Sequence, residues 1–211
     1  MQTKDHLALG HFLLDISDCK ELHKYRRAFL MGCVEPDYNM ASYARGMKGH
    51  RKFRGHNAGN SLAHIEKCLS GIQTNGLQSA WDFFKLGNML HYAADAFTWP
   101  HNEFWRKSLV QHAVYEAKLH ERFTQALNTG SERIESLYSA SLQQYFESAH
   151  DDYRNARHDM KTDCQYIIRV CKTMLAGCLC YAEAPAEEAV ILKEVDLYEG
   201  AYHHGLVSTG R

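Results

Sequence analysis

The hydrophobic positions of this chain recur every three to four residues almost throughout. That spacing is typical of helices with one buried face, and the alternation expected of half-buried strands is absent. The pattern predicts helices at roughly 4–17, 21–31, 58–70, 77–97, 106–127, 131–149 and 151–182, followed by a short helix-compatible segment at 187–197. The sequence therefore predicts an all-α protein.

A long stretch without clear periodicity runs from about Gly32 to Asn57. It has no acidic residue after Asp37 and gathers its basic residues between positions 45 and 54. A loop of this length in a compact domain is more often functional than idle. Two interpretations stay open, a solvated basic loop and a rim that attracts anions.

Length and composition narrow the class of protein. The 211 residues, 45% of them hydrophobic, fit one domain, 1–211, organised as a helical bundle. The net charge of −1 selects no partner, and no apolar run is long enough to span a membrane. The first residues lack a basic and then apolar leader, which predicts a cytoplasmic protein and leaves a removed leader as the alternative.

The cysteine pattern favours a reducing compartment. The chain has seven cysteines, an odd number, and no CxxC motif. Cys164, Cys171 and Cys178 recur every seven residues on one predicted helix. We expect them to be buried, reduced thiols in a core helix.

The most informative motif is a set of metal-ligand types in the order His91-x3-Asp95-x5-His101, then His112-x3-Glu116. Residues four apart share one face of a helix, so each pair can present two ligands to one point. Imidazole nitrogen and carboxylate oxygen are both zinc ligands. The lack of thiolates favours an open, hydrolytic zinc site over a closed structural one.

The surroundings of the first pair support the metal interpretation. A single His-x3-Asp pair on a helix usually consists of solvent-exposed residues or contains a buried histidine whose hydrogen bonds are made within the protein. Here an apolar helix face precedes His91, so His91 and Asp95 are expected to point inward. An unpaired carboxylate is costly there, and a cation would remove that cost.

Further ligand types precede these pairs. They are His6 in the first predicted helix, Asp37 after the second, and His56 in the long loop, where His50 is the alternative to His56. Together with the central five they give eight positions, enough for a cluster of three zinc ions.

In this order the motifs resemble those of the zinc-dependent phospholipase C family, an all-helical group related to the S1/P1-type nucleases. The resemblance covers about residues 5–120. Its most specific part is the segment Leu90–His101, which is similar to the family's His-Tyr-x-x-Asp helix end followed by proline and histidine. His112 and Glu116 match the family's second pair.

The resemblance implies a distribution of the ligands over three zinc sites. One zinc would take Asp37, His56, His91 and Asp95, a second His101, His112 and Glu116, and a third His6 with Asp95 as the bridge. In the family, an amino-terminal tryptophan completes the third site. This chain has Met1 instead, whose α-amine lies five residues before His6 and could ligate once deprotonated.

Such a cluster would hydrolyse a phosphodiester. Two or three divalent cations can hold the phosphate oxygens and lower the pKa of bound water. Asp95 is the expected bridging carboxylate. Asp37 is either a ligand or the base that takes the proton of the attacking water, and both roles stay open.

The substrate is less constrained. In relatives that cleave phosphocholine, the positions of Tyr38 and Phe53 line the headgroup pocket, and two aromatic faces can bind a quaternary ammonium. Arg54 would repel such a cation. The aromatic residues around His101 would either pack in the core or form a rim for peripheral membrane contact.

We therefore expect a zinc phosphodiesterase, most readily a phospholipase C acting on a phospholipid or another phosphate ester. A less favoured alternative is an S1/P1-like nuclease, since the basic stretch 45–54 could neutralise a nucleic-acid backbone and nearby aromatics could stack on bases. A third alternative is a helical protein that binds metal without catalysis.

Overall fold

The computed structural model describes residues 1–39, 58–129 and 141–183, and every regular element within them is helical. The elements are α1 (Thr3–Asp15), α2 (Lys20–Lys24), α3 (Arg26–Tyr38), α5 (Ala58–Asn75), α6 (Ala80–Ala96), the 3-10 turn η1 (Trp99–His101), α7 (Leu109–Thr129), α8 (Leu142–Asn155) and α9 (Met160–Glu183). The predicted all-α fold is confirmed. The prediction of one domain over residues 1–211 stays a prediction.

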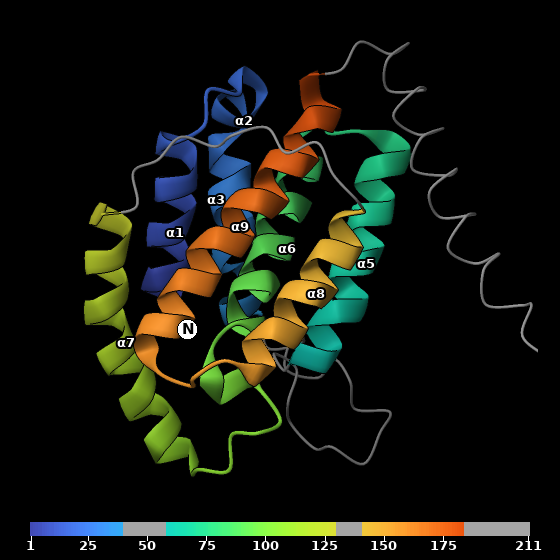
Figure 1. The fold of residues 1–211 in the computed structure, drawn as a ribbon. Helices are drawn as coiled ribbons and strands as arrows, with labels where there is room; N and C mark the ends of the chain where they lie inside the picture. The colour runs from blue at the N-terminus through green and yellow to red at the C-terminus, as the bar shows by residue number, and fades with distance from the viewer. Residues whose placement is uncertain (40–57, 130–140, 184–211) are drawn as a thin grey trace, which may run out of the picture.

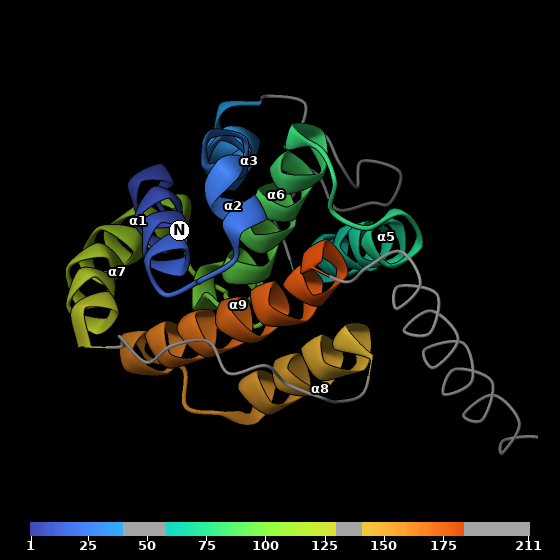
Figure 2. The same cartoon turned by 90° about the horizontal axis from the view of Figure 1, so that it is seen from above.

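Helix α6 lies at the centre of the fold. It contacts α1, α3, α5 and α9 (Figure 1), and in the view from above it lies between α1 and α3 on one side and α5 and α9 on the other (Figure 2). Every residue from Leu86 to Ala96 is buried, including the polar Asn88, His91 and Asp95. A helix buried on all sides normally carries apolar residues only. These polar side chains therefore need partners inside the protein.

Helices α3 and α6 approach each other so closely that their backbones touch. A Cβ atom on Gly32 would lie 2.0 Å from the carbonyl oxygen of Phe84, and one on Gly87 would lie 2.1 Å from that of Phe29. Only glycine can occupy both positions in this packing. About one turn further along each helix, the same crossing brings Asp37 and His91 together.

Two other parts of the fold meet the carboxyl end of α6. Helix α1 packs on α3 and α7, so the amino terminus lies beside this end of α6 (Figure 1). Helix α9 packs against another side of α6 and buries Cys164, Cys171 and Cys178, as their spacing of seven residues predicted. All seven cysteines of the chain are free thiols.

Two predicted boundaries were wrong near the site. The long irregular stretch does not begin at Gly32, because α3 continues to Tyr38 with Pro36 inside it. Asp37 consequently lies in the last turn of a helix rather than after one. Gly32, Cys33 and Pro36 are all buried, so packing against α6 outweighs their poor helix propensity.

The predicted break near residue 150 was also wrong. Helix α8 runs through it to Asn155, and His150 within this helix donates a hydrogen bond from Nε2 to the Oδ1 atom of Asn102 at 2.9 Å. Helix α9 begins only at Met160, and the Asp159 side chain accepts the amide hydrogen of Thr162 at its start. That capping pattern was the missed signal. Residues 131–140 of the predicted helix 131–149 and the whole predicted segment 187–197 lie outside the described residues.

None of the described helices combines the length and the apolar character needed to cross a bilayer.

The glycine contact yields a stability prediction. Gly87→Ala should lower the free energy of unfolding by about 1–3 kcal/mol or more, because the added methyl group must push α3 and α6 apart. Gly71→Ala, in α5, meets no atom within 4 Å and should instead stabilise the protein by about 0.4–1 kcal/mol. Urea unfolding measures both. Equal stability of the two variants would contradict the close crossing.

Candidate metal centre

Two groups of potential ligands gather at the carboxyl end of α6. His6, His91 and Asp95 form the first group and His101, His112 and Glu116 the second, with one ligand atom of each residue within 4.8 Å of the others in its group. Helices α1 and α6 supply the first group, and η1 and α7 supply the second. Within each predicted His-x3-acid pair, the two side chains therefore lie close together. The first pair is on α6 and the second is on α7.

Asp95 lies between the two groups. Its Oδ1 atom is 3.2 Å from His6 Nε2 and 3.8 Å from His101 Nδ1, and its Oδ2 atom is 3.5 Å from His91 Nε2. The carboxylate is 1% exposed. A buried carboxylate that reaches imidazoles with both oxygens can bridge two cations.

A main-chain carbonyl fixes the orientation of His91. Its Nδ1 atom lies 2.8 Å from the carbonyl oxygen of Cys33, which can only accept a hydrogen bond. The proton of a neutral His91 is therefore on Nδ1, which leaves the Nε2 lone pair directed at Asp95 and at Asp37, whose Oδ1 is 3.7 Å away. This arrangement is typical of metal-ligating histidines.

Thr98 orients His101 in a similar way. The Thr98 hydroxyl donates its one proton to the carbonyl oxygen of Asp95 at 2.8 Å and lies 2.6 Å from His101 Nδ1. The hydroxyl oxygen then accepts the Nδ1 proton of His101. The Nε2 atom of His101 keeps its lone pair for a ligand.

The donor set fits a bound cation. His6 stacks on His91 with ring centroids 3.7 Å apart. Both ring nitrogens of His6 and the Oδ2 atom of Asp37 are buried and make no hydrogen bond within the described residues. Such atoms are costly inside a protein, and a zinc ion would give them a partner. Nitrogen and oxygen donors without thiolates suit zinc in a hydrolytic site.

The α-amine of Met1 also enters the centre. It lies 2.7 Å from Asp95 Oδ1 and 3.1 Å from Glu116 Oε1. Burial alone would lower its pKa, but attraction to Asp95 and Glu116 raises the pKa to about 11. Without metal this amine is the cation beside the two carboxylates, so a metal ion that binds it must displace its proton.

Asp5 holds the amino terminus in place. Its carboxylate accepts the main-chain amide hydrogen of Gln2 and is bonded to His120 Nδ1 on α7. His120 thus has a structural role at the amino terminus. This contact ties α1 to the helix that carries His112 and Glu116.

Burial keeps His6 and His101 of the metal-free protein neutral. It lowers the pKa of His6 to about 4, with a further lowering by His91, and it lowers the pKa of His101 to about 3. Burial acts in the opposite direction on Glu116. Burial alone would raise the pKa of Glu116, but the Met1 ammonium and the hydrogen bond from His112 outweigh it and lower this pKa to about 2. Around neutral pH His6 and His101 are therefore neutral imidazoles and Glu116 is an ionised carboxylate, which are the forms that bind metals.

Several predicted site residues cannot be compared with this geometry. His56, its alternative His50, Phe53 and Arg54 lie outside the described residues. Tyr38 is described. It is 75% exposed at the end of α3, next to Asp37.

The aromatic residues around His101 pack mostly inward. Phe97 and Trp105 are buried, and Trp99 and Phe104 are partly buried against the core. Core packing, one of the two roles expected from the sequence, agrees with this placement better than a lipid-facing rim does.

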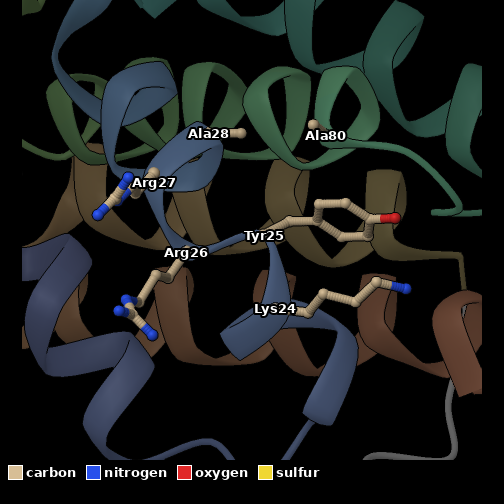
Figure 3. A pocket seen from close by; sticks show the side chains of 6 residues that line it. All are labelled: Lys24, Tyr25, Arg26, Arg27, Ala28 and Ala80. Atoms are coloured by element: carbon tan, nitrogen blue, oxygen red, sulfur yellow. The ribbon is translucent and has the colours of Figure 1, made fainter.

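A surface pocket lies elsewhere, at the junction of α2 and α3 beside the start of α6. It is lined by Lys24, Tyr25, Arg26, Arg27, Ala28 and Ala80 (Figure 3). The two arginine side chains point away from Lys24 and Tyr25, and Lys24 pairs with Glu21 at 2.9 Å. With a rise of 1.5 Å per residue, Ala80 is roughly 22 Å along α6 from Asp95. This pocket is therefore separate from the ligand groups.

Comparisons with known proteins agree with the ligand pattern. A family model described as zinc dependent phospholipase C matches residues 5–161, which is most of the chain and includes both ligand groups. No curated protein and no solved structure matches the chain.

The neutral, buried histidines predict a pH dependence for the zinc-free protein. Unfolded histidines bind protons below about pH 6.5, whereas His6 and His101 resist protonation until about pH 4 and 3. Protonation of these two histidines should therefore not reduce the free energy of unfolding above about pH 6.5. This free energy should fall by about 2 kcal/mol for each of these histidines between pH 7 and pH 5.

Urea unfolding with a chelator present measures this effect. His6→Gln should flatten the pH dependence, and the same change at the exposed His11 should not. An unchanged pH dependence in His6→Gln would contradict the assigned burial.

Proposed function

We propose that this chain, which belongs to the zinc-dependent phospholipase C family, is a metal-dependent phosphodiester hydrolase that cleaves the headgroup of a phospholipid. The observation that supports the proposal best is the convergence of two ligand groups on the buried Asp95. Zinc ions bound there would supply Lewis acidity and a nucleophilic water near neutral pH.

The proposed ligand sets extend the two groups. His91, Asp95 and Asp37 would hold one ion together with His56, while His101, His112 and Glu116 would hold a second. His6 would hold a third ion, completed by the Met1 α-amine and bridged by Asp95. The contacts of Met1 with Asp95 and Glu116 support this last site.

Asp37 is the proposed general base. Its side chain is 13% exposed, Oδ1 lies near His91, and the buried Oδ2 makes no hydrogen bond to any residue that the structure describes. It thus lies between the buried ligands and the solvent, where it could accept a proton from water that attacks the phosphorus atom. Direct ligation by Asp37 is the alternative role.

Tyr38 is the proposed contact for the headgroup. It follows Asp37 in the chain, and its exposed ring could meet a cationic headgroup by a cation–π interaction. Phe53, in the segment 40–57, is the second proposed aromatic contact for the headgroup. Arg54 of the same segment is also a proposed substrate contact, and its charge favours a headgroup without a cation. A nuclease remains the second candidate, because the basic residues of this same segment suit a phosphate backbone.

The proposal predicts hydrolysis of a phosphatidylcholine-type headgroup ester by the zinc-loaded protein. Asp37→Asn should lower kcat about 10²–10⁴-fold if Asp37 is the base, with the zinc content unchanged. Released phosphomonoester and zinc content would be measured on the same samples, with Asp15→Asn on the surface of α1 as the control.

The outcomes separate the candidates. Hydrolysis of single-stranded DNA alone would contradict the phospholipase proposal and favour the nuclease. Zinc binding without hydrolysis of either substrate would favour a non-catalytic metal-binding protein. Loss of zinc in Asp37→Asn would make Asp37 a ligand.

A further inference from the structure

Asp163, in the first turn of α9, is a fully buried carboxylate outside the two ligand groups. Its side chain is 0% exposed. Oδ1 accepts a hydrogen bond from the Tyr153 hydroxyl at 2.7 Å, and Oδ2 accepts from the Tyr115 hydroxyl at 2.9 Å. The main-chain amide of Trp99 donates a third bond to Oδ2 at 3.1 Å. One side chain thus joins four elements of the fold.

Two of these donors belong to the segments that carry the second ligand group. Trp99 begins η1 and lies two residues before His101. Tyr115 lies on α7, next to Glu116 and three residues after His112. Both donate to the same oxygen of Asp163, so that oxygen fixes η1 and α7 relative to each other. The third donor, Tyr153, belongs to α8, which supplies no ligand.

The first ligand group has other supports. His91 is oriented by the Cys33 carbonyl, and the glycine contact between α3 and α6 sets the position of its helix. Neither contact involves Asp163. A substitution at Asp163 should therefore weaken metal binding by the second ligand group more than by the first.

We propose that Asp163 is a positioning residue for the second ligand group, holding His101 at the distance from His112 and Glu116 at which the three can share one ion. The inference rests on the proposed function only in taking this group to bind zinc. Metal ligands commonly depend on such supporting hydrogen bonds, and losing one typically costs about 10–100-fold in metal affinity or activity.

The charges at Asp163 support strong bonds. Burial raises its pKa to about 6 against the lowering effect of the three hydrogen bonds, so the group is mostly ionised at neutral pH. Burial and the neighbouring Asp163 raise the pKa values of Tyr115 and Tyr153 well above their usual range. Both hydroxyls therefore stay protonated and donate to a charged acceptor, which makes the hydrogen bonds stronger than neutral ones.

The two tyrosines provide a matched pair of variants. Tyr115→Phe and Tyr153→Phe each remove one hydroxyl donor to Asp163 and keep the ring in place. Only Tyr115 lies on a ligand helix. Elemental analysis over a series of zinc-buffered solutions would give the free zinc concentration at which each bound equivalent is lost.

In Tyr115→Phe, one zinc equivalent should require about 10–100-fold more free zinc than in the wild type, while the others load normally. Tyr153→Phe should load like the wild type, although both variants should show lowered melting temperatures. Asp163→Asn should weaken the binding of the same zinc equivalent as Tyr115→Phe does. The double variant Asp163→Asn/Tyr115→Phe should bind this equivalent little more weakly than Asp163→Asn alone. These variants keep the side-chain volume, so folding can be checked by circular dichroism.

Equal zinc loading of the two tyrosine variants would overturn the positioning role and leave the proposed function intact. A wild type that binds less than one zinc would instead overturn the metal centre, and the positioning role with it.

Discussion

The structure depends on one unfavourable placement, the carboxylate of Asp95 in the interior of an all-helical protein. Asp95 is buried near the end of α6, where an unpaired charge would destabilise the fold. Two histidine side chains and the α-amine of Met1 lie within 3.5 Å of its oxygens. A helical fold that needed only stability would use an apolar residue here. The grouping is therefore better explained by the binding of cations.

Contacts elsewhere in the fold hold the elements that surround Asp95. The close approach of the two backbones at Gly32 and at Gly87 brings α3 against α6 and so brings Asp37 to His91. Asp5 and His120 tie the amino terminus to α7. Because the elements that carry the ligands are held by separate contacts, the centre is preorganised before metal binds, which favours a catalytic site.

Much of the centre was predictable from the sequence. The i, i+4 spacing identified His91 with Asp95 and His112 with Glu116, because helical periodicity converts spacing into shared direction. The close contacts of His6 and Met1 with Asp95 followed only from motif order and resemblance, and the fold supplied the distances. The support from the Cys33 carbonyl was not predictable, since every residue has a carbonyl. The continuation of α3 through Pro36 depended on packing against α6, which local propensity does not encode.

The most direct test of this account is anomalous X-ray diffraction at the zinc edge from crystals of the zinc-loaded protein. The account predicts two or three zinc peaks, at least one of them within bonding distance of Asp95 and His91 together. The absence of any zinc peak beside Asp95, with zinc present in the crystal, would contradict it.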